Sequence, residues 1–349
     1  MKLVNNTPFP ALLEMGSTTD NEQLGTVVCK VSYQWFDGGD LFPLPSESMW
    51  PVNRAPAMFQ GVMLLPDADF RREGIDVLVF GDAVSPEGKP VTGLQVGVAS
   101  GSFLRHVDVL GDRRWQRVGE GEGAGWQASA PQPFTRMPLG TERAYGGKAS
   151  LQGSDPQPFS MNPQGKGYAL DEAQVEGLAL PNLERPAQRI SRWTDQPVPA
   201  CFHKPQGGLL LAAEGPDSWR DAAGAADPLR LPQVLMQQSF QQAPPDFICP
   251  RGALGPRLSL AGFDASGVQH MALPPEVASP QQGPCAYVEV GKLRAVLPLR
   301  IGSMVVLTLH RMLVLTFVAS FRYLVRPGET RQAVLEWHGA TDFALGGRP

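Results

Sequence analysis

The sequence MVVLTLHRMLVLTFVASFRYLV, residues 304–325, is the one apolar stretch of this chain that resembles a membrane span in length. His310 and Arg311 lie inside it, and an arginine near the middle of a bilayer costs about 2.5 to 3.5 kcal/mol on insertion scales. The residues instead alternate with a period of two, which is typical of β-strands. The apolar parity, interrupted only by Arg311, consists of Leu307, Leu309, Leu313, Leu315, Phe317, Ala319, Phe321, Tyr323 and Val325, and the other parity carries Thr308, His310, Thr316, Ser320, Arg322 and Arg326. We therefore predict one strand or a pair of strands with one buried face, and no membrane span.

The same alternation recurs towards both ends of the chain. Near the N-terminus it predicts a half-buried strand with Val27, Cys29, Val31, Tyr33 and Trp35 on one face and Lys30, Ser32 and Gln34 on the other. Two alternating runs flank Ser100-Gly101-Ser102, which indicates a hairpin. Further strands are predicted at Ile75–Val79, Arg257–Phe263, Tyr287–Val290, Leu293–Leu299 and Arg331–Trp337, with a turn at Arg326–Glu329 before the last.

Glycine and proline shape the middle of the chain. The 38 glycines and 34 prolines make up about 21% of the 349 residues, against an average combined share of about 12%. Both residues are unfavourable inside helices, so this share excludes a helical bundle. Residues 111–256 hold many of these prolines and few periodic stretches, so we expect ordered, extended coil pinned by its aromatic residues. Short helices are predicted at Gly215–Gly224 and at Pro232–Gln242.

Together these patterns predict a mainly β fold. We expect antiparallel β-sandwich or barrel-like sheets, a long proline-rich ordered coil and a few short helices. A single domain over residues 1–349 would then consist of β-rich residues 1–110, a wrapping coil at 111–256, β-rich residues 257–340 and a short tail at 341–349.

Net charge and cysteine content narrow the function classes. Thirty Lys and Arg against 34 Asp and Glu give a net charge of −4, so the chain lacks the cationic surplus with which proteins bind nucleic acid. The four cysteines are scattered without a C-x-x-C pair, and the N-terminal sequence has no signal-peptide pattern. A reducing cytoplasm is therefore the expected compartment.

Motifs for catalysis or cofactor binding are missing from the sequence. Gly165-Lys166-Gly167 lacks the hydroxyl of a phosphate-binding loop, no G-x-S-x-G elbow occurs, and the five histidines lack metal-ligand spacing. We therefore expect a protein that is not an enzyme, without catalytic residues, cofactor or metal.

Charge is distributed unevenly along the chain. Residues 1–87 hold five basic and twelve acidic residues, whereas residues 292–331 hold seven basic residues and one acidic residue. The two segments could neutralise each other by pairing in one sheet, or the second could steer a protein partner to one face of the molecule. Both interpretations can hold together.

Ordered motifs run through nearly the whole chain. They are LGDRRW at Leu110–Trp115, PFTRMPLGTERAYGG at Pro133–Gly147, MNPQGKGY at Met161–Tyr168, LPNLERP at Leu180–Pro186, QPVPACF at Gln196–Phe202 and QQAPPDF at Gln241–Phe247, with VNNTPF at Val4–Phe9 and VLEWHG at Val334–Gly339 near the ends. In this order they resemble the bacterial family known as domain of unknown function 2169.

The resemblance implies an adaptor, or dedicated chaperone, of the type VI secretion system. Such a protein binds an effector toxin in the bacterial cytoplasm and helps load it onto the VgrG spike protein. The resemblance carries no catalytic residues with it, which agrees with the missing catalytic motifs.

The motif residues are candidates for structural or partner-binding roles. The planar donor groups of Arg136 and Arg143 suit an acceptor such as Glu142, and Tyr145 can pack beside the turn at Gly146-Gly147. Turn-forming side chains can hydrogen-bond the backbone of the long coil. The full set of candidates is Trp115, Arg136, Glu142, Arg143, Tyr145, Asn162, Asn182 and Asp246.

A carbohydrate-binding or glycan-hydrolysing β-rich protein is the alternative. It would use tryptophans as sugar platforms and a carboxylate pair, such as Glu142 and Asp155 or Asp217 and Asp221, as catalyst. The tryptophans available for this are Trp35, Trp50, Trp115, Trp126, Trp193 and Trp219.

Overall fold

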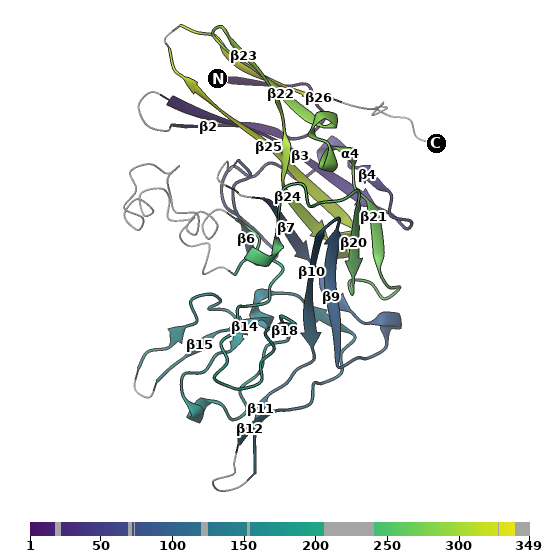
Figure 1. Ribbon diagram of the computed structural model, residues 1–349, viewed down its shortest axis with the longest axis vertical. Helices are drawn as coiled ribbons and strands as arrows, with labels where there is room; N and C mark the ends of the chain where they lie inside the picture. Colours follow the sequence, from purple (N-terminus) through teal and green to yellow (C-terminus); the bar gives the residue numbers. More distant parts are fainter. Residues whose placement is uncertain are drawn as a thin grey trace.

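The computed structural model describes residues 1–17, 22–68, 72, 74–119, 125–151, 154–205, 241–326 and 328–338 (Figure 1). Within these ranges the chain is mainly β, as predicted, with several mostly antiparallel sheets and no closed barrel. The one α-helix described there is the short α4 (Pro275–Ala278). In the described part of the chain no helix has the length and apolar character needed to cross a membrane.

The largest sheet joins strands from both ends of the chain, as the alternation predicts. Its seven strands are ordered β19-β7-β24-β25-β3-β2, with β4 also paired to β3. β3 and β25 are antiparallel from Glu22↔Leu324 to Gln34↔Met312, whereas β7 and β24 are parallel. The strands are β2 (Ala11–Ser17), β3 (Glu22–Trp35), β4 (Leu41–Pro43), β7 (Ile75–Phe80), β19 (Ile248–Cys249), β24 (Arg300–Leu307) and β25 (Met312–Leu324).

The apolar segment at 304–325 forms a pair of strands, one of the two predicted outcomes. β24 ends at Leu307, a 3-10 turn follows over Thr308–His310, and Arg311 takes the left-handed conformation with φ of 50° before β25 begins. The arginine that interrupts the apolar parity thus lies in the turn. The prediction of one buried face is wrong for the middle of the hairpin, where both faces are buried.

The strand predicted as half-buried near the N-terminus is also buried on both faces. Lys30 is 3% exposed and Ser32 is completely buried, because the segment around residues 50–67 covers this face of β3. Lys30 pairs with Asp67 at 2.6 Å and donates to the backbone oxygen of Pro51 at 3.0 Å, and the hydroxyl of Ser32 accepts from Trp50 N. Further along, the hairpin β5 (Ala57–Phe59) and β6 (Val62–Leu64) supplies apolar side chains that pack with those of β7, β24 and β25.

A four-stranded sheet packs against one face of this large sheet, at the top of Figure 1. It consists of β1 (Lys2–Asn5), β26 (Arg331–Trp337), β22 (Pro284–Val290) and β23 (Leu293–Pro298), in that order. β1 and β26 are parallel, so the two ends of the chain meet again here. Trp337 packs between the sheets, with its ring centroid 4.8 Å from that of Phe9 and 6.1 Å from that of Phe317.

A five-stranded sheet contains the predicted hairpin. Its order is β18-β10-β9-β20-β21, and β9 and β10 turn through Gly101 at φ of +59°. The strands are β9 (Gly93–Ser100), β10 (Phe103–Leu110), β18 (Leu183–Glu184), β20 (Arg257–Ala261) and β21 (Gln269–Ala272).

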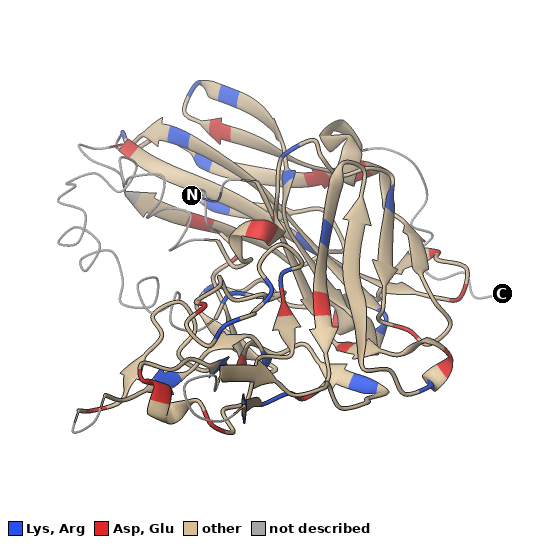
Figure 2. Ribbon diagram, turned by 60° about the horizontal axis from the view of Figure 1, so that its bottom comes forward, with Lys and Arg blue, Asp and Glu red and all other residues tan. Residues whose placement is uncertain are grey.

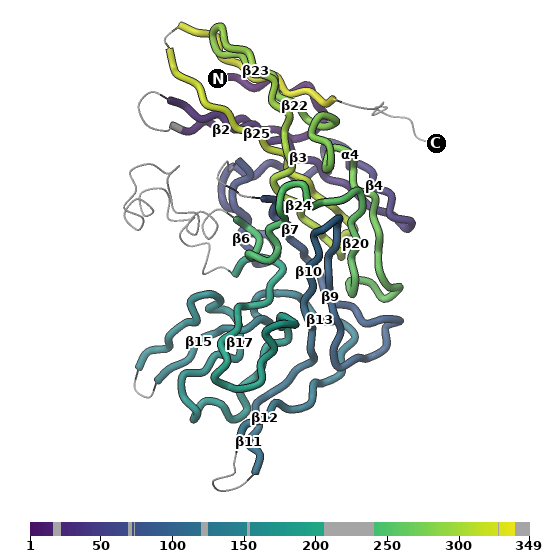
Figure 3. Tube along the Cα trace, viewed as in Figure 1, coloured from purple at the N-terminus to yellow at the C-terminus, as the bar shows by residue number. Residues whose placement is uncertain are grey.

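The proline-rich segment is mainly irregular, but it contains short strand pairs that the sequence did not predict. In Figure 3 its residues up to about 200 lie together at the lower end of the view. The predicted helix at 215–224 lies outside the described residues, as does that at 232–242 apart from Gln241 and Gln242. The pairs are β11 (Trp115–Val118) with β12 (Gly125–Ala128), β13 (Arg136–Pro138) with β8 (Asp82–Val84), β14 (Tyr145–Gly146) with β17 (Lys166–Gly167), and β15 (Lys148–Ala149) with β16 (Gln157–Pro158).

The uneven charge along the sequence is partly neutralised by two ion pairs at the large sheet and its turns. Arg311 pairs with Asp37 at 2.7 Å and Arg322 pairs with Glu22 at 3.5 Å. In the view of Figure 2, basic and acidic residues are interspersed over the strands and the coil. The interpretation that the two charged segments pair within one sheet therefore holds for Arg322 and Glu22, whereas Arg311 and Asp37 pair between turns at the end of the sheet.

Candidate functional site: an arginine-lined groove beside a pinned coil

Asn182 is the centre of a polar cluster in the coil. Its side chain is completely buried and donates from Nδ2 to the backbone oxygen of Leu110 at 2.9 Å and to Oδ1 of Asp112 at 3.0 Å. Arg143 donates from Nη1 to Oδ1 of Asn182 at 3.1 Å. The cluster thereby joins three motifs at the end of β10.

Asp112 and Lys166 complete this cluster, although the sequence did not single them out. The hydrogen bond from Asn182 is the main cause that lowers the pKa of the Asp112 carboxyl below its usual value. Burial acts against it, and the charges of Lys166 and Arg143 lower the pKa further. Burial lowers the pKa of the Lys166 ammonium, which lies 3.7 Å from Oδ1 of Asp112. The carboxylate is thus held in its charged form by neighbours that it also holds in place.

Asn162 holds the neighbouring turn. Its buried Nδ2 donates to the backbone oxygens of Thr141 at 2.8 Å and of Tyr145 at 3.1 Å. A side chain at Gly146, where φ is +146°, would place its Cβ 2.1 Å from the backbone oxygen of Asn162. Tyr145 is buried and packs edge-on against Phe159, with ring centroids 5.1 Å apart. This turn therefore depends on both the asparagine and the glycine.

The other sequence candidates have separate partners. Trp115 is 2% exposed and packs with Val175 and Leu180 in a small apolar cluster. Arg136 pairs on the surface with Asp82 at 3.0 Å, and the Asp246 carboxylate pairs with Arg185 at 2.8 Å. Glu142 is exposed, and the acceptors of the two arginines are Asp82 and Asn182 rather than Glu142.

The structure thus brings Arg143, Tyr145, Asn162 and Asn182 into one part of the coil and leaves Trp115, Arg136 and Asp246 with other partners. The side chains of Arg143, Asn162 and Asn182 form hydrogen bonds to one another or to backbone oxygens here. These bonds hold this part of the coil in shape.

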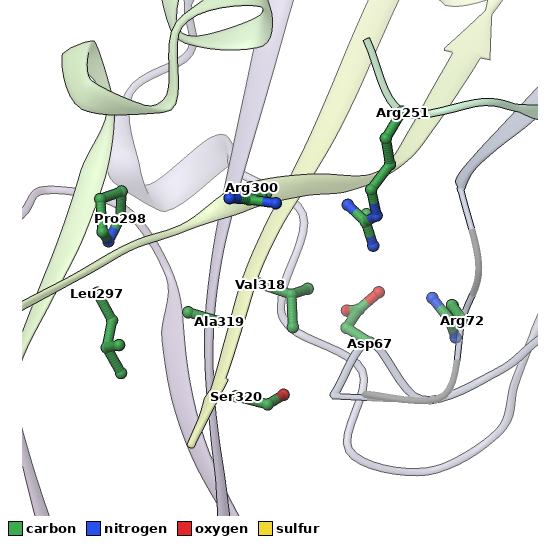
Figure 4. A pocket seen from close by; sticks show the side chains of 10 residues that line it. Asp67, Arg72, Arg251, Leu297, Pro298, Arg300, Val318, Ala319 and Ser320 are labelled. Atoms are coloured by element: carbon green, nitrogen blue, oxygen red, sulfur yellow. The ribbon is translucent and has the colours of Figure 1, made fainter.

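An open groove lies elsewhere, where the chain crosses from the four-stranded to the seven-stranded sheet (Figure 4). Its cavity has a volume of about 440 Å³. Residues from β23, β24 and β25 meet there with residues from the loops that flank β7 and β19. The lining residues are Asp67, Arg72, Arg251, Leu297, Pro298, Arg300, Gly302, Val318, Ala319 and Ser320.

Two arginines give this groove its charge. Asp67 is neutralised by Lys30 at 2.6 Å, and Arg72 lies 3.7 Å from Asp76. Arg251 donates to the backbone oxygen of Ile301 at 3.3 Å, and in the described part of the chain neither Arg251 nor Arg300 forms an ion pair with a carboxylate. Partial burial and the charge of Arg300 lower the pKa of the Arg251 guanidinium. An anion placed here would relieve the repulsion between the two cations.

A smaller, more apolar cavity adjoins the groove. It has a volume of about 250 Å³ and shares Arg251 and Arg300 with the first cavity. Its remaining lining is mostly aliphatic and consists of Ile75, Gly252, Leu254, Val277, Ala278, Pro280 and Ile301. The two cavities together suit a carboxylate that neighbours an apolar group.

Binding is the chemistry that these residues favour. An arginine stays protonated at neutral pH, so Arg251 and Arg300 can attract an anion but cannot serve as a general base. The four cysteines are buried, and burial raises the pKa of Cys201 to about 12, which keeps that thiol protonated. In the described part of the chain no group of His, Cys, Asp and Glu side chains is arranged to hold a metal ion.

Comparison with known proteins places the chain in a family. A family model described as "Uncharacterized protein conserved in bacteria (DUF2169)" matches residues 20–317. The chain belongs to this family. The matched range includes the Asn182 cluster and both groove arginines, so the two features of this DUF2169 protein lie within the family domain. Neither the curated proteins nor the solved structures provide a match to the chain.

Sequence reasoning missed the groove arginines. Arg251 and Arg300 come from the two ends of a long stretch that includes four strands, and only the fold brings them together. The one signal in the sequence was the basic surplus of residues 292–331, which includes Arg300.

Proposed function

We propose that this DUF2169 protein is a non-enzymatic adaptor, or dedicated chaperone, that binds a type VI secretion effector toxin and helps load it onto the VgrG spike. The bacterial cytoplasm is the compartment in which this would occur. The observation that carries the proposal is the open groove in which Arg251 and Arg300, without acidic partners in the described part of the chain, adjoin an apolar cavity. Such a surface suits a segment of another protein that carries acidic and apolar side chains.

The polar clusters support binding over catalysis. The Asn182 cluster consists of hydrogen bonds within the coil, and the groove presents two arginines, which attract anions but cannot act as general bases. The protein would therefore present a rigid surface, and its affinity for the effector would come from burial and charge without nucleotide hydrolysis.

The carbohydrate alternative has less support. Trp35 and Trp115 are 3% and 2% exposed, so neither can stack on a sugar ring. Trp126 donates from Nε1 to the Glu172 carboxylate at 2.8 Å, and Trp219 lies outside the described residues. Asp217 and Asp221, one of the two carboxylate pairs considered, lie outside them as well.

Co-purification tests the proposal. The protein is expressed with the toxin encoded beside its gene, and we expect a complex that survives gel filtration and also retains VgrG. Replacing Arg251 and Arg300 together by Ala should weaken toxin binding by about tenfold or more, because charge-assisted contacts are lost. Arg136→Ala is the matched control, because it removes a surface arginine outside the groove. A native protein that retains no toxin would contradict the proposed function.

A further inference from the structure

One edge of β25 is open along half of the strand. β25 pairs with β3 over its whole length, but its pairing with β24 ends at Arg300↔Val318. A register shift between Ile301 and Ser303 bends β24 there, and the preceding chain passes through Leu299 into β23 of the other sheet. From Ala319 to Leu324, β25 therefore has one strand neighbour in the described part of the chain.

The direction of the backbone groups follows from the pairing. Lys30 N donates to Pro10 O on the β2 side of β3, so the adjacent Cys29 directs its backbone groups towards β25. Cys29 lies opposite Phe317, so the backbone groups of Phe317 face β3. Backbone groups alternate in direction along a strand, so those of the even-numbered residues of β25 face away from β3. The N–H and C=O groups of Ser320, Arg322 and Leu324 consequently face the open edge.

β23 extends along this open edge. Leu297 of β23 and Ala319 of β25 line the arginine groove, while Leu293 of β23 and Leu324 of β25 line a second cavity of about 500 Å³. Figure 4 shows Leu297 on one side of the groove and Ala319 and Ser320 on the strand behind it. β23 is itself the end strand of its sheet. The two cavities therefore lie one after the other along β23 and β25.

The two faces of the open edge differ in chemistry. Arg300 lies opposite Val318 and therefore shares a face of the sheet with Ser320 and Arg322. Tyr323 points to the other face, where its hydroxyl donates to Met15 Sδ at 3.8 Å. Alternate β23 residues, among them Leu293 and Leu297, contribute apolar side chains to the groove. A strand added at this edge would meet arginines on one face and aliphatic side chains on the other.

The charge of the groove selects the kind of strand. The two cavities are lined by six basic and three acidic side chains. Asp67 already pairs with Lys30, Glu22 with Arg322, and Arg72 with Asp76. Outside these pairs the two cavities are lined by four basic side chains and one acidic side chain, which are Arg251, Lys292, Arg300, Arg326 and Glu329. The surplus is positive, so an acidic strand is the complementary one.

We propose that an extended segment of the partner protein, in which acidic residues alternate with aliphatic ones, adds to β25 as a strand along Ser320–Leu324. Its backbone would pair with the open N–H and C=O groups, its acidic side chains would lie beside Arg300 and Arg322, and its aliphatic side chains would pack under β23. That the partner is an effector toxin rests on the proposed function, whereas the mode of binding rests on the open edge itself.

A proline substitution in the open edge tests the mode of binding. Ser320→Pro removes an N–H that faces the open edge, so it leaves the pairing of β25 with β3 intact. Ser320→Ala is its matched control, because both variants lose the 3.0 Å hydrogen bond between Ser320 and Thr26 and only the proline loses the N–H.

The probe is a synthetic peptide of alternating Glu and Val, with alternating Lys and Val as its charge control. We expect calorimetry to show binding of the Glu peptide to the native protein and to Ser320→Ala, and about tenfold weaker binding to Ser320→Pro. The Lys peptide should not bind. Equal affinity of the two variants for the Glu peptide, or no binding of that peptide to the native protein, would overturn the proposal.

Hydrogen exchange gives a second readout that needs no variant. The amides of Ser320, Arg322 and Leu324 should gain protection when the Glu peptide binds, and unchanged exchange at all three would also overturn the proposal. The outcomes separate the two proposals. If Ser320→Pro and Ser320→Ala retain the toxin equally, the adaptor function stands and strand addition is refuted. If the Glu peptide binds but no toxin complex forms, strand addition stands and the adaptor function is refuted.

Discussion

Arg143 and Asn182 are linked twice: the guanidinium of Arg143 donates to Oδ1 of Asn182 at 3.1 Å, and the backbone oxygen of Arg143 accepts from Asn182 N at 2.8 Å. Asn182 in turn holds Leu110 at the end of β10 through both its backbone oxygen and its side chain. Two distant loops of the coil are therefore tied to each other and to the five-stranded sheet through one buried asparagine.

Asn182→Ala and Arg143→Ala should each lower the free energy of unfolding by about 1 to 3 kcal/mol, because each leaves a buried partner without its hydrogen bond. Arg143→Lys should restore little of the loss, since lysine lacks the planar donor group. The measurement is urea denaturation of each variant and of the double variant, whose cost should be less than the sum. If Arg143→Ala leaves stability unchanged but abolishes toxin binding, the residue belongs to the interface instead.

Arg136→Ala should behave differently from Arg143→Ala. The Arg136 side chain is 55% exposed and its partner Asp82 is 18% exposed, so water screens the pair. We expect a loss of about 0 to 1 kcal/mol, measured in the same denaturation series. A loss as large as that of Arg143→Ala would contradict this distinction.

The long strands were predictable because apolar side chains recur at every second position along them. The alternation in β25 and β3 identified both strands, but it missed that the second face is also covered along β3 and along the first half of β25. From the sequence, Lys30 and Ser32 are expected to face solvent. In the structure, Asp67 and the backbone oxygen of Pro51 are the partners of Lys30, and the backbone N–H of Trp50 is that of Ser32. The sequence of β3 alone cannot show that a distant segment of the chain covers its second face.

Tyr33→Phe should destabilise the fold through Glu276. The Tyr33 hydroxyl donates to Oε1 of Glu276 at 2.7 Å, and both side chains are buried. Losing this donor leaves a buried carboxyl without it and should cost about 1 to 3 kcal/mol in thermal or chemical denaturation. Replacing both partners, as in Tyr33→Phe with Glu276→Leu, should recover part of the loss. No recovery in the double variant would show that the hydroxyl acts through another contact.

Mild acid should destabilise the protein through His203. This side chain is buried and stacks on Phe80 with ring centroids 5.3 Å apart, and burial lowers its pKa to about 4. Below about pH 6.5 the histidine is protonated in the unfolded chain but stays neutral in the folded protein. The free energy of unfolding therefore falls as the pH drops towards 4, by about 3 kcal/mol at most.

His203→Phe keeps a stacked ring without the titrating nitrogen. The difference in unfolding free energy between native protein and variant, measured from pH 7.5 to pH 4, isolates the histidine from the carboxylates that also titrate. The native protein should lose more stability than the variant over this range. Parallel curves would mean that His203 takes up its proton without unfolding.

The candidate site was predictable only in part, and for a physical reason. The motif residues Arg143, Asn162 and Asn182 could be identified because turn formers and planar donors have recognisable local chemistry. The groove arginines have no such local signature, since an unpaired cation is defined by what surrounds it in space. The open edge of β25 likewise depends on where the pairing of β24 with β25 ends, which the sequence of β25 does not show.

The parallel pairing of β1 with β26 has a consequence for the newborn chain. Lys2 lies opposite Gln332, so the first strand leaves the ribosome roughly 15 to 70 s before its partner exists, at about 5 to 20 residues per second. β3 must wait in the same way for β25. A polypeptide that ends before β25 lacks the partner of β3 and also lacks Val318, Ala319 and Ser320 of the groove lining. Such a polypeptide therefore could not present the groove.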